Sequence, residues 1–441
     1  MSFDATPELG SCCTRRKRIL GTPSWILTRV RKRQDFRVMI SSENFVVLPI
    51  LFATCVALAK PLERGDPKQL GFDPAKLTTM SKEIQGLISD NDLPGAIVAI
   101  ARHDKLAYHE VFGKLKPSGD EAMPPNAVFQ IFSMTKPIIA VAVMQLVERG
   151  KLSLDDPIEK YIPAFGKTTV WENGVEVPPK GVITIAELLR HTSGLTYGFF
   201  GTGHVRAQYK AKGIDARTQT LSQFVDNIAS IPLEHHPGTV WEYSMASDVL
   251  GRVIEIVSDK PLQDYLKQNI FDPLGMSDTG FTGPLVPMGR VAGAATAGWQ
   301  LRPADVEVPF KSGGGGLLST MNDYLSFCRM ILHGGSLNDN EVLSKATIAL
   351  MTRDQLGGLP RGQYNGPGYG YGFGFGFAVR TDDQATYPGS VGDLWWGGYS
   401  GTYFWIDPTE ELIAVILVQA PNMRRTLRPL MRRLVYDALL R

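Results

Sequence analysis

The sequence predicts an α+β fold, in which an antiparallel sheet is flanked by helices and joined to a mostly helical lobe. Three observations support this prediction. A strand pair lies near the start of the folded region, strand patterns return in the last third of the chain, and short helical segments fill about residues 160–290. We expect the functional site in the cleft between the sheet and the lobe, because ligand sites are common where two such units meet.

The first part of the sheet is predicted from residue patterns that follow a helix. Asp73–Ile88 has helical periodicity, whereas Gly95–Arg102 and Leu106–Phe112 alternate and are rich in β-branched and aromatic residues. The turn His103-Asp104-Lys105 separates these two segments, so we expect them to form a hairpin.

The middle of the chain is predicted to be helical. One helix begins near Ser133, continues to Glu148 or Arg149, and stops at Gly150, a favourable C-cap residue. Ile183–Leu189 and Asp248–Val257 are helical segments of the lobe.

The last third of the chain returns to strands. We expect strands at Tyr371–Arg380, Leu394–Ile406 and Leu412–Gln419, with Asp407-Pro408-Thr409-Glu410 as the turn between the last two. Met423–Leu440 is expected to form the closing helix.

The first 59 residues differ in composition from the rest. Residues 1–38 carry nine Lys or Arg and three Asp or Glu, a net charge of +6 that leaves −4 for the remainder. We expect residues 1–38 to be a disordered basic extension and residues 60–441 to form one domain. Within residues 39–59, Phe45–Ala59 is a run of fifteen residues without a charge that ends in Ala57-Leu58-Ala59. This run is shorter than the roughly twenty residues of a membrane span, so we interpret it as a signal peptide.

The expected localisation is therefore periplasmic or secreted, with a short membrane anchor as the alternative. Residues 1–59 could contact a membrane transiently, and Met39 is an alternative start. The mildly acidic folded part has no basic footprint for nucleic acid. If the signal is removed, Cys328 is the one remaining cysteine, so no intrachain disulfide is expected. No Cys/His spacing indicates a metal site, and we expect no cofactor.

The motif most suggestive of chemistry is Ser133-Met134-Thr135-Lys136, at the start of the predicted helix. Residues at i and i+3 share a helix face, so the lysine amine can reach the serine hydroxyl. A serine hydroxyl becomes a good nucleophile when a neighbouring base takes its proton. The pattern therefore favours a serine nucleophile that a lysine activates.

A second candidate is Tyr243, within the segment Pro237–Ser244. The Pro-Gly pair turns the chain, and a short aromatic stretch delivers the tyrosine to the cleft. An adjacent lysine ammonium would lower the tyrosine pKa and favour the phenolate. Tyr243 could then act as general base and later as general acid. The alternative is a core tyrosine in a loop.

A third candidate is the segment Trp395–Gly401, on the strand that opens the last predicted hairpin. Glycines inside a strand usually mark a close approach by a ligand or another backbone. Such a strand can point one N–H at a substrate carbonyl, and the N–H of Ser133 would complete a two-donor oxyanion hole. The alternative is a β-bulge packed on tryptophans.

These three motifs, in this order, resemble the serine β-lactamase and penicillin-binding-protein superfamily. Within it, the chain is most similar to class C β-lactamases and the family VIII carboxylesterases. The resemblance runs from about Leu70 to the C-terminus and includes the linking stretches Leu146–Pro157, Leu188–Leu195 and Gly314–Thr320.

The resemblance implies a role for each motif residue. Ser133 would be the nucleophile, Lys136 its activating amine, and Tyr243 the second general base. Trp396-Gly397-Gly398 would occupy the place of the Lys-Thr-Gly strand, and the Tyr399 N–H would complete the oxyanion hole. His191-Thr192-Ser193-Gly194 is better explained as a structural turn of the lobe.

Two departures from the superfamily pattern bear on the substrate. Tyr-x-Asn reads Tyr243-Ser244-Met245, and Trp396 stands in place of the lysine of Lys-Thr-Gly. The missing amide and cation would otherwise hold a β-lactam or a D-Ala-D-Ala end, and a lost charge-assisted hydrogen bond costs a few kcal/mol.

The function that these observations favour is a serine carboxylesterase that acts on small-molecule esters through an acyl-enzyme. The alternatives are a β-lactamase or D-Ala carboxypeptidase-like penicillin-binding protein, and an acyltransferase on the same fold. A non-catalytic penicillin-recognising protein is disfavoured, because Ser133, Lys136 and Tyr243 are all present.

Overall fold

The computed structural model describes residues 61–281, 288–294, 306–364 and 366–440. The predictions for residues 1–38 and 39–59 lie outside the described residues. Within the described ranges, no helix is both long enough and apolar enough to span a bilayer. Cys328 is buried and forms no disulfide.

One antiparallel sheet of seven strands holds the structure together, in the order β10-β11-β12-β13-β14-β1-β2. Its strands are β1 (Gly95–Arg102), β2 (Lys105–Gly113), β10 (Tyr371–Phe373), β11 (Ala378–Arg380), β12 (Leu394–Gly397), β13 (Tyr403–Asp407) and β14 (Leu412–Val418). Strands from the first and last parts of the fold meet where β14 pairs with β1, with Ala96 opposite Val418. All of β14 and nearly all of β1 are buried, which accounts for their continuous apolar sequences.

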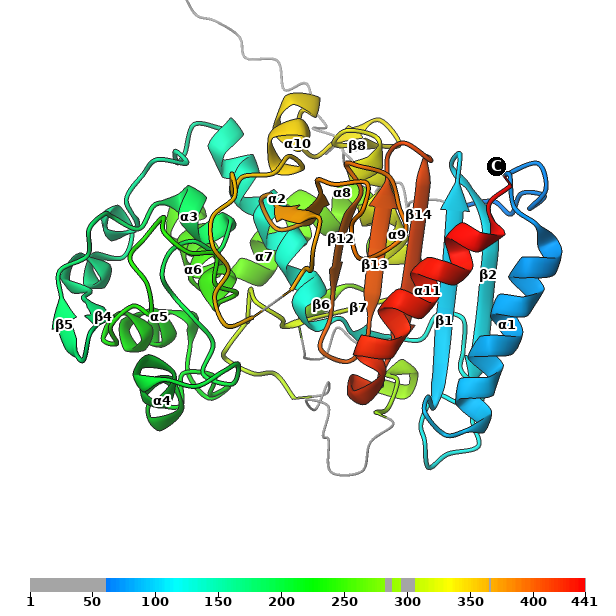
Figure 1. Ribbon diagram of the computed structural model, residues 1–441, viewed down its shortest axis with the longest axis horizontal. Helices are drawn as coiled ribbons and strands as arrows, with labels where there is room; N and C mark the ends of the chain where they lie inside the picture. The colour runs from blue at the N-terminus through cyan, green and yellow to red at the C-terminus, as the bar shows by residue number, and fades with distance from the viewer. Residues whose placement is uncertain (1–60, 282–287, 295–305, 365, 441) are drawn as a thin grey trace, which may run out of the picture. The chain divides into compact units, whose positions relative to one another are not determined.

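Helices cover both faces of this sheet. Figure 1 shows α1 (Pro74–Ser89) and α11 (Arg424–Ala438) side by side on one face, while α9 (Met321–Leu332) packs against β13, β14 and β1 on the other. The Asp73 side chain caps α1 by accepting a hydrogen bond from the Ala75 N–H, and Pro74 occupies the first turn. The predicted α+β architecture is therefore confirmed.

The segment between the two groups of strands is mostly helical, as predicted. It follows α2 (Thr135–Glu148), which packs against α6 (Ala246–Ser258). Capping boxes begin α3 and α5 and define where these short helices start. The other helices are α3 (Ile185–Leu189), α4 (His204–Ala211), α5 (Leu221–Ala229), α7 (Leu262–Leu266), α8 (Asp272–Leu274) and α10 (Lys345–Met351). The short strands are β3 (Phe129–Gln130), β4 (Val170–Glu172), β5 (Val175–Val177), β6 (Gly280–Phe281), β7 (Leu317–Ser319), β8 (Ser336–Leu337) and β9 (Asn340–Glu341).

Two segments were each predicted to form one strand, and this prediction is wrong, because each segment forms a pair of antiparallel strands. Tyr371–Arg380 divides into β10 and β11, and Gly376, with φ +89°, lies in the turn between them. Leu394–Ile406 divides into β12 and β13, which Gly398–Thr402 connect. The apolar pattern continues through both turns, so the pattern alone did not show where the chain reverses.

Arg432 fastens the closing helix to the sheet. Its guanidinium and the Asp393 carboxylate are fully buried and form two hydrogen bonds of 2.9 and 3.0 Å. The same guanidinium donates to the Tyr403 hydroxyl and the Pro388 carbonyl, both at 3.0 Å. These four hydrogen bonds join α11 to β13 and to the segment that enters β12.

We predict that Arg432→Met lowers the free energy of unfolding by about 3–5 kcal/mol, because it removes both hydrogen bonds to the buried Asp393 carboxylate. Among the described residues, the remaining ion-pair partner of Asp393 is then the Arg380 guanidinium, 4.0 Å away. The matched control is Arg433→Met, since Arg433 is about half exposed and forms an ion pair of 3.6 Å with the exposed Asp437. Its expected effect is below about 1 kcal/mol. Equal urea midpoints for the two variants would contradict the structural importance of the Arg432–Asp393 pair.

Candidate active site

Ser133 lies in a single 3₁₀ turn, Phe132–Met134, that leads into α2. Phe132 has φ +44°, a conformation that L-residues rarely adopt and that is enriched at functional sites. The turn is held in place by the Tyr324 hydroxyl, which donates to the Met134 carbonyl at 3.0 Å. Ser133 is half-buried, so its side chain remains accessible at the start of a buried helix.

Lys136 lies one turn further along and is 1% exposed. Its Nζ donates to the Ser133 Oγ at 3.3 Å, the Tyr197 hydroxyl at 2.9 Å, and the Gly314 carbonyl at 2.6 Å. The helix-spacing argument expected the amine to reach the serine hydroxyl, and the two groups are within hydrogen-bond distance.

Burial lowers the pKa of Lys136 from its ordinary value to about 7, although the nearby Asp248 carboxylate opposes the shift. Asp248 is itself buried and accepts hydrogen bonds from the Ser312 hydroxyl at 2.5 Å and the Gly314 N–H at 3.0 Å. It therefore holds the loop whose Gly314 carbonyl contacts the amine. A substantial fraction of Lys136 is neutral near pH 7, as a general base requires.

Tyr243 is buried beside this amine, with the centre of its ring 4.7 Å from the Lys136 Nζ. Its hydroxyl has no hydrogen-bond partner among the described residues. Burial raises the pKa of Tyr243, although Ser133, Trp396 and Arg428 act in the opposite direction. The sequence argument expected a lowered pKa and a phenolate. That expectation is wrong, because the cost of burying the phenolate outweighs the neighbouring groups that favour it.

Sequence reasoning missed Tyr197. It is buried, its hydroxyl contacts the Lys136 amine, and its ring centre lies 5.2 Å from that of Tyr243. The available signal was its place two residues after the family-like stretch that ends at Leu195. Asp248 and Gly314 were also not recognised as supports of the amine.

The segment His191–Gly194 is buried beneath the site. The His191 ring packs edge-on against Tyr243 at 5.1 Å between centres, and its Nδ1 lies 3.1 Å from the Ser244 hydroxyl. Burial, and secondarily Lys136, holds the pKa of His191 well below its usual value. A buried neutral histidine that orients the Tyr243 segment fits the structural interpretation of this turn.

The end of β12 is fastened to the chain immediately before Ser133. Thr402 Oγ1 donates to the Ile131 carbonyl at 3.3 Å, and the Ser400 hydroxyl donates to the Gln130 carbonyl at 3.2 Å. A Cβ at Gly398 would lie 2.5 Å from the Ile131 oxygen, so only glycine fits there. These contacts bring the segment that contains Tyr399 close to the serine turn.

Aromatic rings line the surroundings of Tyr243. Trp396 on β12 has its ring centre 5.2 Å from that of Tyr243, and Tyr364 lies 4.9 Å away. Tyr399 lies beside the turn that contains Ser133, with its ring centre 6.1 Å from that of Phe132. The structure thus brings the predicted residues of all three motifs together where the helical segment meets the sheet.

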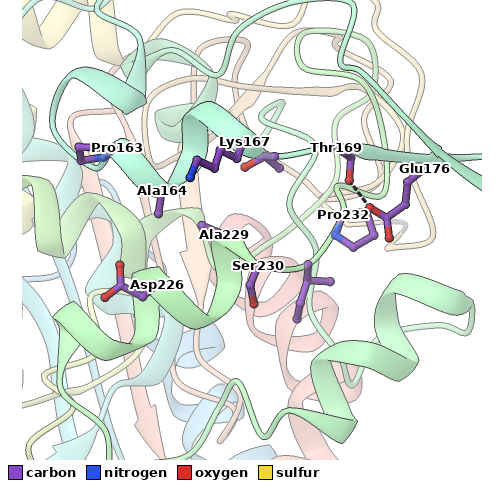
Figure 2. A pocket seen from close by; sticks show the side chains of 11 residues that line it. Pro163, Ala164, Lys167, Thr169, Glu176, Asp226, Ala229, Ser230 and Pro232 are labelled. Carbon is purple, nitrogen blue, oxygen red and sulfur yellow. Dashed lines mark hydrogen bonds between the residues drawn. The ribbon is translucent and has the colours of Figure 1, made fainter.

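A separate cavity of about 470 Å³ lies in the helical segment, between η3 (Pro163–Lys167), the β4–β5 hairpin and α5. Figure 2 shows Lys167, Glu176 and Asp226 around it, with the Thr169 hydroxyl donating to Glu176 at 2.7 Å. Its lining includes none of the three motifs, so we assign it no part in the chemistry.

The fold is that of the β-lactamase type of serine enzymes. The family model described as Beta-lactamase matches residues 80–436, and the chain therefore belongs to this family. Protein Rv1367c of Mycobacterium tuberculosis is 34% identical, over 74% of this chain and 86% of that protein. Esterase EstB of Burkholderia gladioli is 31% identical, over 80% of this chain and 93% of its own.

A solved structure is also similar. EstCE1, described as a hydrolase with promiscuous acyltransferase activity, has a TM-score of 0.72 and 29% identity. The match covers 84% of this chain and all of EstCE1. The chain is thus a member of the serine β-lactamase and transpeptidase superfamily with esterases among its relatives.

The lowered pKa of Lys136 predicts how the free energy of unfolding changes with pH. With a pKa of about 7 when folded and 10.5 when unfolded, Lys136 binds fewer protons in the folded state between these values. The free energy of unfolding should therefore rise with pH in this window, relative to Lys136→Met, by about 1 kcal/mol per pH unit.

Urea unfolding of both proteins at pH 7, 8 and 9 measures this difference. Lys82→Met, which alters an exposed lysine on α1, serves as the control. A constant difference between wild type and Lys136→Met across the three pH values would show that the amine titrates normally.

Proposed function

We propose that the protein is a serine carboxylesterase that cleaves small uncharged esters through an acyl-enzyme on Ser133. The observation that carries this proposal is the accessible Ser133 hydroxyl, 3.3 Å from an almost fully buried amine. Burial lowers the pKa of that amine to about 7, so it can accept the serine proton at neutral pH.

In the proposed acylation step, neutral Lys136 takes the Ser133 proton as Oγ attacks the ester carbonyl carbon. The carbonyl π electrons move to oxygen, and the N–H groups of Ser133 and Tyr399 stabilise this oxyanion. When the tetrahedral intermediate collapses, the bond to the alcohol oxygen breaks. Tyr243, kept neutral by burial, donates its proton to the leaving alkoxide and recovers a proton from the Lys136 ammonium.

Deacylation repeats these steps with water in place of the alcohol. Water loses a proton to the Lys136–Tyr243 pair as it attacks the acyl carbon, and Ser133 leaves with a proton. Tyr197 and Gly314 hold the amine at the serine throughout, because both accept hydrogen bonds from its Nζ.

The surroundings of Ser133 favour esters over β-lactams. Trp396 presents a buried aromatic ring where the superfamily pattern has a lysine, and Tyr243 and Tyr364 extend this apolar wall. Such a wall suits an uncharged acyl or alcohol group better than a carboxylate. The similarity to EstB and EstCE1 supports the same choice.

An acyltransferase is the second candidate, because the similar EstCE1 is a hydrolase with promiscuous acyltransferase activity. The two reactions share the acyl-enzyme and differ in whether water or an alcohol resolves it. Product analysis with an added primary alcohol separates them, since transfer yields a new ester and hydrolysis yields the free acid.

We predict that brief exposure to p-nitrophenyl butyrate adds one butyryl mass to Ser133 and releases nitrophenol rapidly, whereas nitrocefin opens slowly or not at all. Ser133→Ala should show neither the adduct nor turnover, because the attacking oxygen is gone. Intact-mass and peptide-mapping spectra test this directly. Wild-type turnover by Ser133→Ala would remove Ser133 as nucleophile, and efficient nitrocefin turnover would favour the β-lactamase alternative.

We also predict that Tyr243→Phe retains less than about a tenth of kcat, because an acid/base group contributes roughly 10²–10⁴-fold. Tyr371→Phe is the matched control, because it also removes a buried tyrosine hydroxyl that has no hydrogen-bond partner in the described part of the chain. Tyr371 lies on β10, outside the three motifs, and should leave kcat unchanged. Comparable rates for both variants would contradict the role assigned to Tyr243.

A further inference from the structure

Arg428 on α11 places a cation against the end of β12. It is half-buried, and its Nη2 donates to the Gly398 carbonyl at 3.4 Å. Its guanidinium carbon lies 5.8 Å from the centres of the Trp395 and Tyr403 rings, and its buried Nε has no hydrogen-bond partner among the described residues.

This arginine differs from its neighbour on the same helix face. Arg432, one turn further along, forms a buried ion pair with Asp393. Among the described residues, no carboxylate forms an ion pair with Arg428, so its charge is not neutralised by a partner of that kind. Its positive charge reaches the site, because it opposes the rise in the pKa of both Tyr243 and Tyr364.

Gly397 provides the space that Arg428 occupies. A Cβ at residue 397 would lie 2.6 Å from the Arg428 Nη2 and 3.0 Å from Cζ and Nε. A side chain at residue 397 would therefore displace the guanidinium. The two glycines of Trp396-Gly397-Gly398 thus have separate functions, since Gly398 admits the Ile131 backbone and Gly397 admits Arg428.

The carbonyl that Arg428 contacts belongs to a particular peptide. The Gly398 C=O and the Tyr399 N–H are the two ends of one planar unit, and this unit is trans. In a trans peptide these groups point in opposite directions. The Gly401 N–H also donates to this carbonyl, at 3.3 Å, so Arg428 acts together with the backbone of the turn. Donors that hold the carbonyl also fix the direction of the N–H, and a positive charge beside the oxygen polarises the N–H toward an acceptor.

We propose that Arg428 is a positioning residue for the oxyanion hole: it holds the Gly398–Tyr399 peptide so that the Tyr399 N–H faces the substrate carbonyl at Ser133. This inference rests on the proposed function, because it assumes that the Tyr399 N–H is an oxyanion donor. Arg428 does not itself touch the reacting atoms in this scheme.

The first test compares Arg428→Ala with Arg425→Ala, which removes an exposed cation from the same helix. Loss of an oxyanion donor typically costs about 10²–10³ in kcat. Arg428→Ala should cost less, roughly ten- to a hundredfold, because the peptide is loosened and not removed. KM for p-nitrophenyl butyrate should stay within a factor of about three, since the peptide acts chiefly in the transition state.

Two readouts separate positioning from a merely structural role. Butylboronic acid forms a tetrahedral adduct on serine, so its inhibition constant should rise in proportion to the loss of kcat/KM. Guanidinium chloride at non-denaturing millimolar concentration should restore part of kcat in Arg428→Ala and have no such effect on Arg425→Ala. A general loss of folding would produce neither result.

Gly397→Ala provides a second variant that leaves the arginine in place. It should displace the guanidinium and lower kcat, whereas adding it to Arg428→Ala should cause little further loss. This non-additivity would show that the two residues act through one contact. Fully additive losses would overturn the inference.

The inference and the proposed function can fail separately. Wild-type kcat and boronate affinity in Arg428→Ala, together with an intact Ser133 adduct, would overturn the inference alone. Absence of the Ser133 adduct in the wild-type protein would instead overturn the proposed function on which the inference rests.

Discussion

The burial of one lysine amine is the constraint on which the site depends. Lys136 is taken out of water by the apolar helix α2 and the segments packed around it, and this lowers its pKa to about 7. A buried amine is costly unless its protons find acceptors. Ser133, Tyr197 and Gly314 supply them, and Asp248 holds the Gly314 loop in place. The hydrogen bonds that offset the cost of burying the amine also hold it next to Ser133.

A second constraint is the junction between the serine turn and the sheet. The carbonyls of Gln130 and Ile131 receive hydrogen bonds from the β12–β13 turn, and Gln419 at the end of β14 donates to Gln130 at 3.1 Å. Residues almost 300 positions apart in the chain therefore fix one another. Phe132, with its left-handed conformation, lies between this junction and Ser133.

Trp396-Gly397-Gly398 combines a buried aromatic side chain with two closely packed glycines. The tryptophan replaces a cation by an apolar wall, while the two glycines admit the Arg428 guanidinium and the Ile131 backbone. A positive charge remains near the site, but it comes from α11 and lies behind the strand, where it contacts a peptide carbonyl. A cation is therefore present with either arrangement, but Arg428 contacts the backbone of the strand, whereas the lysine of the superfamily pattern belongs to the strand itself.

The sequence by itself determined the α+β architecture, the first hairpin, the extent of α2 and the one-turn spacing of Ser133 and Lys136, because these depend on local periodicity and on turn residues. It did not show that the Leu394–Ile406 segment reverses, since the apolar pattern continues through the turn. Only the tertiary structure decided that Tyr243 is neutral, that Tyr197 and Gly314 hold the amine, and that Arg428 lies against Gly397. These properties arise from burial and from contacts between residues far apart in the chain, and neither is encoded in a local pattern.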